Sequence, residues 1–303
     1  MELAYISFRQ ILTMVILMTI GVVCAKVKWI DSETNKRLST LLLFLVNPMV
    51  LFLSFQKPFE EELLHGLMVS LMLSIISYFI AIALAHLIYW NRNGKTFEIE
   101  KFGSVYSNSG FIGIPLIYGI FGSEGVFYLT AYLMMFTLFS WTHGLIVMSG
   151  KKDFSSMKKA LVSPPLIGVF SGFIFFVLGI RIPDTVEAPL RFISYMNTPL
   201  AMLIAGASIT TANVLGIFKD IRIYKLCFVR LLVIPLVVIF AFSFWDINPI
   251  VLGVVVIATS CPLAASVFLF AYRYDRDYQY ASQAFTASII LSMATIPLLM
   301  LLL

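Results

Sequence analysis

Ser107-Asn108-Ser109-Gly110-Phe111-Ile112-Gly113-Ile114-Pro115 lies in the middle of an apolar stretch, about residues 102–121, that is long enough to cross a membrane. A proline inside a helix removes one backbone donor and obstructs the carbonyl one turn back. In hydrocarbon, the freed backbone groups need partners from protein or from a water-filled cavity. The stretch therefore predicts a broken membrane helix with a polar site at the break.

The whole chain has the composition of a protein that crosses the membrane many times. Of its 303 residues, 60% are hydrophobic and 12% are charged, whereas soluble domains have about 45–50% and roughly 25%. The same values exclude a disordered or nucleic-acid-binding protein, despite the net charge of +5. At about 30 residues per helix and loop, the length allows roughly ten spans and no sizeable soluble domain.

Short polar clusters divide the chain into ten expected membrane-spanning helices. They cover, approximately, residues 5–25, 38–56, 64–90, 102–121, 126–149, 163–180, 190–211, 224–244, 248–271 and 280–303. The first apolar run lacks a small-residue cleavage site and is too long for a signal peptide, so we expect it to remain as a span.

Lysine and arginine are distributed unequally between the two sides of this arrangement. The loops after the odd-numbered spans, with the residues flanking them, hold 17 of the 21. The positive-inside rule places these loops in the cytoplasm and both termini outside. We therefore expect a multi-pass protein of the cell (cytoplasmic) membrane, with the lipid bilayer and its anionic headgroups as a partner.

The basic link near residues 150–160 divides the expected membrane transport domain, 5–303, into halves of five spans, about 1–150 and 151–303. Because five is odd, the second half must be inverted relative to the first. The spacing from Asn47 to Asn197 is 150 residues, and that from Asn108 to Thr259 is 151. The expected fold class is all-α integral membrane, with ten helices in two inverted five-helix repeats and broken crossover helices 4 and 9.

Two facing breaks predict a site for an anion. A helix that restarts after a break presents N–H groups with partial positive charge, which suits a carboxylate. Prolines that merely kink their helices are the simpler alternative. The expected substrate contacts are Asn108, Ser109, Gly110, Thr259 and Ser260. The residues expected to shape the breaks are Gly113, Pro115, Cys261 and Pro262, and those that line the site or bend spans 2 and 7 around it are Asn47, Pro48, Asn197 and Pro199.

The residues around both breaks resemble the auxin efflux carrier family, which includes bacterial malonate or malate permeases and plant PIN-type carriers. The likeness rests on residues 107–116 and 121–125, on Cys261-Pro262-Leu263-Ala264 with Tyr274-Asp275, and on the final span. It implies ten helices in two inverted repeats and an elevator-like motion against spans 1, 2, 6 and 7. It also implies an asparagine near each crossover for the substrate carboxylate. Asn108 matches this pattern, whereas span 9 offers Thr259 and Ser260.

Few ionisable residues lie within the expected spans. His86 and His143 are candidates for a proton relay, although we favour hydrogen bonding near the membrane interface. Arg230, about two turns into span 8, is expected to extend toward the cytoplasmic headgroups. No metal-ligand spacing or phosphate loop occurs in the sequence, so no cofactor and no metal site is expected.

We predict a secondary transporter of a small organic anion, working by alternating access. One alternative is a sodium-coupled symporter of the bile-acid-carrier type, disfavoured because span 9 contains no carboxylate. Others are a membrane-embedded enzyme, disfavoured because no facing aspartate pair or H-E-x-x-H motif is present, and a sensor that binds without transport. The sequence leaves the substrate, its direction, the coupling ion and a homodimer open.

Overall fold

A computed structural model describes residues 2–90, 96–150, 162–211, 217 and 220–302. The described residues form helices and the turns between them, and none of them lies in a β-strand. This confirms the all-α prediction. Most of the basic central link, residues 151–161, lies outside the described residues.

The helices cover the regions of the predicted spans, and α6 runs through the turn predicted between the fourth and fifth spans. The first half contains α1 (Glu2–Lys26), α2 (Ser32–Leu41), η1 (Leu42–Val46), α3 (Asn47–Ser54), α4 (Glu61–Ile88), α5 (Phe97–Val105), η2 (Ser109–Gly113), α6 (Ile114–Phe139), η3 (Ser140–Gly144) and α7 (Leu145–Ser149), where η marks a π-helical turn. The second half contains α9 (Pro164–Val177), α10 (Asp184–Tyr195), α11 (Asn197–Thr211), α13 (Ile221–Phe228), η4 (Val229–Val233), α14 (Ile234–Phe242), α15 (Pro249–Ser260), α16 (Ser266–Arg273) and α17 (Tyr278–Met300).

Three prolines follow π-helical turns directly. Pro48, Pro115 and Pro235 are each the second residue of the α-helix that begins after η1, η2 or η4. Proline lacks the N–H that an α-helix needs, and its ring crowds the carbonyl one turn back. A wider turn before the proline accommodates both effects. The prolines therefore reshape these spans locally without ending them.

Seven helical segments in the described chain are long and apolar enough to cross a membrane. One of them, Ser109–Ser149, is 41 residues long and changes direction at Gly122, whose φ of 64° suits glycine. The apolar helices α9 and α15 are shorter. The chain thus has the helices of a multi-pass membrane protein, while the division into ten crossings stays a prediction.

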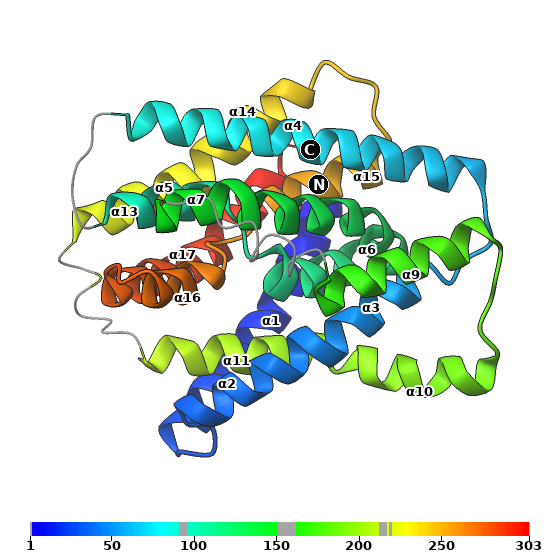
Figure 1. The fold of residues 1–303 in the computed structure, drawn as a ribbon, viewed down its shortest axis with the longest axis horizontal. Coiled ribbons are helices and arrows are strands. Elements are labelled where there is room, and N and C mark those ends of the chain that lie inside the picture. The colour runs from blue at the N-terminus through cyan, green and yellow to red at the C-terminus, as the bar shows by residue number, and fades with distance from the viewer. Residues whose placement is uncertain (1, 91–95, 151–161, 212–216, 218–219, 303) are drawn as a thin grey trace.

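The helices form two groups. The first, called the scaffold group, consists of α1, α2–α3, α9 and α10–α11, which pack on one another; α2, α3, α10 and α11 lie along one edge of the molecule (Figure 1). The helices α1 and α11 meet backbone to backbone, because a Cβ at Gly206 would lie 2.0 Å from Met18 O and one at Gly21 would lie 2.5 Å from Leu203 O. Glycine at positions 21 and 206 therefore permits the close packing of α1 on α11.

The second group, called the core group, consists of α4, α5, η2–α6, α7, α13–α14, α15, α16 and α17. It contains both helices that were predicted to break. Helix α4 packs against α6 and α15, while α17 packs against α13 and α16. The candidate site therefore lies within one packed unit, next to the scaffold group.

Candidate functional site

Both predicted breaks are present in the core group. The first separates α5 from η2 at Tyr106–Asn108, and the second separates α15 from α16 at Cys261–Ala265. Each break leaves a helix C-terminus on one side and a helix N-terminus on the other. The two short non-helical segments are therefore flanked by four helix ends.

The two breaks are in direct contact. Asn108 N donates a hydrogen bond to Pro262 O at 2.8 Å, and Ala264 N donates one to Tyr106 O at 2.9 Å. This antiparallel pairing satisfies backbone groups that would otherwise lack partners inside a membrane. Segments on opposite halves of the chain are thus joined at the position that the sequence predicted. We call this arrangement the crossover.

The pairing at the crossover is antiparallel. Ser107 lies opposite Leu263, and Asn108 lies opposite Pro262. Thr259, which the sequence matched with Asn108, lies in the last turn of α15. The second break, residues 261–265, contains no side-chain amide. The correspondence of Asn108 with Thr259 stays a prediction.

The first break presents polar groups beside open space. Asn108 is 5% exposed and Ser109 is fully buried. The Ser109 hydroxyl has no hydrogen-bond partner among the described residues, and a Cβ built on Gly110 meets no atom within 4 Å. The N–H groups of Ser109, Gly110 and Phe111 stand at a helix start, where no preceding carbonyl of that helix can accept them. These donors can serve a small ligand.

The second break uses its hydroxyls within the protein. The Ser260 hydroxyl donates to Val256 O at 2.7 Å, and the Thr259 hydroxyl donates to the Tyr132 hydroxyl at 3.4 Å. Tyr132 Oη also lies 3.3 Å from Ser107 Oγ. Tyr132 of α6 therefore links the two breaks, although nothing in the sequence distinguishes it from the other twelve tyrosines.

Gly113 and Pro262, which we expected to shape the breaks, lie at contacts between the two breaks, and Pro115 lies in α6. A Cβ on Gly113 would lie 3.2 Å from Ser109 Cβ and 3.4 Å from Cys261 Sγ, so glycine permits this close approach. Pro262 O accepts the Asn108 N–H, and Pro115 O accepts a hydrogen bond of 3.2 Å from Gln10 Nε2 on α1.

The two asparagines of spans 2 and 7 meet each other in the scaffold group. Asn197 Nδ2 donates to Asn47 Oδ1 at 2.8 Å, and both side chains are buried. The prolines that follow them, Pro48 and Pro199, lie in α3 and α11. This pair joins the two halves of the chain at a second place, while Asn197 Oδ1 is buried without a hydrogen-bond partner among the described residues.

Arg230 is placed differently from the prediction. It does not extend to the headgroups, because its side chain is fully buried in η4. Its guanidinium binds the carbonyl oxygens at the ends of both broken helices. The acceptors are Ser104 O and Val105 O at 3.1 Å each, Cys261 O at 3.2 Å, and Thr259 O. One cation therefore caps the C-termini of α5 and α15 together.

Comparison with known proteins assigns the chain to a family. The family model described as membrane transport protein matches residues 6–153 and 151–300, which together cover nearly the whole chain. The chain belongs to this family, the auxin efflux carrier family. The resemblance inferred from the two breaks is confirmed.

Two similar proteins are both described as uncharacterized transporters. One, from Methanothermobacter thermautotrophicus, is 27% identical over 308 residues, covering 96% of this chain and 97% of the relative. The other, from Methanocaldococcus jannaschii, is 24% identical over 306 residues and covers 97% of each chain. The protein is a membrane transporter and not an enzyme.

Two of the three histidines of this transporter, His86 and His143, form hydrogen bonds through Nδ1. The His143 Nδ1 lies 2.8 Å from the hydroxyl of Tyr106, and His86 Nδ1 lies 2.9 Å from Ile82 O. Their rings are 5.3 Å apart. The favoured hydrogen-bonding role thus agrees with the geometry, and His143 contacts Tyr106, the first residue of the first break.

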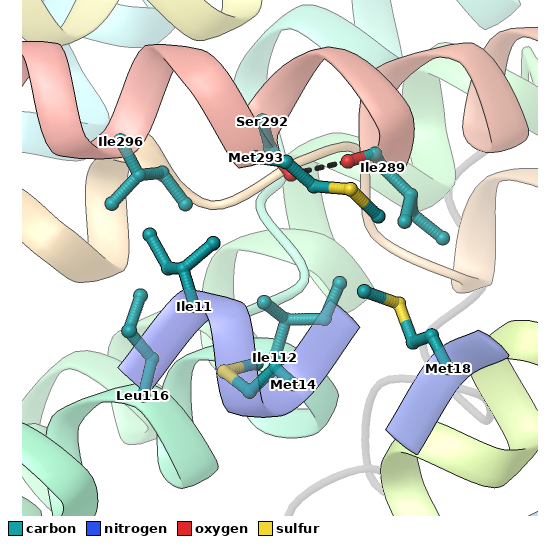
Figure 2. Close-up of a pocket in the computed structure, with 9 residues that line it drawn as sticks. All are labelled: Ile11, Met14, Met18, Ile112, Leu116, Ile289, Ser292, Met293 and Ile296. Carbon is teal, nitrogen blue, oxygen red and sulfur yellow. Dashed lines mark hydrogen bonds between the residues drawn. The ribbon is translucent and has the colours of Figure 1, made fainter. Parts of the chain in front are cut away.

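A small apolar cavity lies between the scaffold and core groups of the transporter beside the crossover, where α1 packs against α6 and α17. Figure 2 shows residues of α1, such as Met14 and Met18, facing Ile112 of η2 and residues of α17. Ser292, which is polar and lines the cavity, donates a hydrogen bond from its hydroxyl to Ile289 O at 2.7 Å. The cavity offers little to a charged group, so we treat it as part of the seam between the two groups.

Proposed function

We propose that this transporter carries a small organic anion whose carboxylate binds at the crossover. Asn108, the Ser109 hydroxyl and the N–H groups at the start of η2 would donate hydrogen bonds to it. Hydrogen bonds from such groups to a charged acceptor contribute about 1.5–3 kcal/mol each. Thr259 and Ser260, which we also expected to contact substrate, offer oxygen atoms whose hydrogens are directed to Tyr132 and Val256.

The observation that carries the proposal is the bonding of Arg230 to both helix C-termini. Each helix end carries about half an elementary charge, negative at the C-terminus and positive at the N-terminus. The Arg230 charge offsets the two C-termini, so the partial charges of the two N-termini remain. An excess of about one positive charge at a buried site favours an anion.

We further propose that transport is secondary and uses alternating access of the elevator type. The core group, which holds the whole crossover, would move against the scaffold group of α1, α2–α3, α9 and α10–α11. The apolar seam between the groups supports such sliding, because it needs few directional bonds to break. In this proposal ten helices in two inverted repeats cross the cell membrane, with both termini outside.

Flux measurements in proteoliposomes test the proposal. A panel of dicarboxylates, aliphatic monocarboxylates and aromatic acids should contain at least one anion with saturable flux. Asn108→Ala should weaken its apparent affinity by about 10–100-fold, the equivalent of one hydrogen bond to a charge. The control is Thr19→Ala, which alters an exposed hydroxyl on α1 that bonds to its own helix.

The outcomes separate the remaining functions. Unaltered carboxylate flux in a folded Asn108→Ala protein would remove Asn108 from the site. Carboxylates that raise the melting temperature without any flux would indicate a sensor. Saturable flux of cations alone would overturn the anion proposal.

A further inference from the structure

Arg230 has an unusual set of partners for a buried cation. Its side chain is fully buried, and the ion pairs of the described chain do not include it. Four backbone carbonyls from two different helix ends accept its hydrogen bonds instead. A buried charge without such partners would be strongly unfavourable.

Carbonyl oxygens that converge from several backbone segments are the ligands by which proteins bind bare alkali cations. Here the C-termini of α5 and α15 provide such a set, and their partial negative charges add to its attraction for a cation. The guanidinium occupies the place of that cation. It is permanently charged and covalently attached, so it neither leaves nor loses its proton.

We propose that Arg230 is a built-in cation that replaces a mobile coupling cation at the crossover. This inference rests on the proposed anion transport. In each cycle Arg230 stays with the core group in both the loaded and the empty state. The anion therefore crosses without a sodium or potassium ion at this position. Arg230 acts as a positioning residue, because it binds the helix ends that shape the site.

The wild-type protein gives the first test. Its anion flux at a fixed membrane potential should be unchanged when sodium and potassium are both replaced by choline. Its melting temperature, measured without any anion substrate, should also be independent of these cations. A requirement for sodium or potassium in either measurement overturns the inference.

Removing the side chain gives the second test. Arg230→Ala leaves the carbonyls without a cation, so its melting temperature should fall and should then rise with guanidinium at concentrations well below those that denature. Sodium or potassium should produce a smaller rise and choline none. Because the assay needs no substrate, its result is independent of whether the protein carries a carboxylate. A variant that responds equally to all of these cations overturns the inference.

Two further substitutions separate the charge from the hydrogen bonds, and they apply even if Arg230→Ala does not fold. Arg230→Lys keeps the charge but has fewer donors, so the melting temperature and flux that it retains should remain independent of sodium and potassium. Arg230→Gln keeps a donor without the charge, and should weaken anion affinity by about tenfold or more. Wild-type behaviour of Arg230→Gln would show that the charge is dispensable. The control is Arg222→Gln, on the same span, whose guanidinium binds the Asp220 carboxylate near the helix start; it should show no new cation dependence.

Discussion

Ser109 is the residue at which the crossover is chemically incomplete. Its hydroxyl is buried, has no partner among the described residues, and lies beside the open space at Gly110. Buried hydroxyls in native proteins nearly always have a partner, so an unpaired one suggests an absent ligand. A buried hydroxyl without a partner lowers the stability of the fold, so a purely structural role does not explain Ser109.

Ser109→Ala therefore should weaken the binding of the transported anion while leaving the fold intact. Removing an unpaired buried hydroxyl has little effect on stability, whereas losing a hydrogen bond to an anion costs about 1.5–3 kcal/mol. We expect an unchanged or slightly higher melting temperature and a 10- to 100-fold higher KM, on the order of that loss. Ser171→Ala is the matched control, because the Ser171 hydroxyl bonds to Ile167 O on its own helix. A Ser109→Ala protein with lower stability and normal KM would assign the hydroxyl a structural role.

At the residue scale the sequence predicted the donors but not the groups that hold them. Asn108 and Ser109 stand out as polar residues next to a proline within an apolar span. Arg230 was misjudged because basic residues near the cytoplasmic end of a span usually reach the headgroups. Its position beyond two helical turns, with apolar residues on both sides, was the available signal. Tyr132 offers no such signal, since only the tertiary fold places it between the breaks.

At the element scale the breaks were predictable and their register was not. Pro262 lies within the second interruption, and the polar residues Ser107 to Ser109 mark the first. Pro115 follows the first interruption and lies in α6, so the proline alone did not locate that break. Pairing of Ser107 with Leu263 depends on how two segments fit together in space. Matching residue types at a fixed spacing therefore could not show that Ser107 lies opposite Leu263. The π-turns before the prolines were likewise not readable from composition.

The packing of α1 on α11 gives a prediction about stability. In Gly206→Ala the added Cβ would lie 2.0 Å from Met18 O, which is much closer than two non-bonded atoms can approach. Backbone atoms cannot rotate away, so the two helices must separate, at a cost of about 1–3 kcal/mol. A thermal melt of the purified protein should show a lower melting temperature. Gly119→Ala is the control, because the atoms nearest its Cβ belong to the end of the flexible Gln10 side chain, which can rotate away. Equal melting temperatures for the two variants would contradict the tight α1–α11 contact.

At the scale of the whole molecule, the two halves of the chain meet at two places. Asn47 and Asn197 are hydrogen-bonded in the scaffold group, and the two breaks pair in the core group. The matching spacings in the sequence indicated that the halves are related, since both sites recur at nearly one interval. Which helices would join which group came only from the family resemblance and the packing. Spacing along a chain carries no information about which surfaces touch.

The division into two groups predicts where a cross-link stops transport. Gln10 of α1 and Gly119 of α6 lie on opposite sides of the seam, and a Cβ on Gly119 would lie 2.1 Å from Gln10 Cδ. The Gly119 position thus lies within reach of the Gln10 side chain, which makes cysteines at these two positions candidates for a disulfide with Cβ atoms about 3.5–4.5 Å apart. The background carries Cys24→Ser, since Cys227 and Cys261 are buried.

If the core group moves as a body, oxidation of the Gln10→Cys, Gly119→Cys protein should abolish flux, and a reductant should restore it. The reason is that one covalent bond across the seam prevents displacement of the crossover relative to α1. A second pair, Asn35→Cys and Ser208→Cys, replaces two hydrogen-bonded residues that both belong to the scaffold group. Joining this pair with a short bifunctional thiol reagent should leave flux unchanged, because these helices move together. Normal flux through a fully oxidised cross-seam pair would place the moving boundary elsewhere and exclude the elevator motion proposed here.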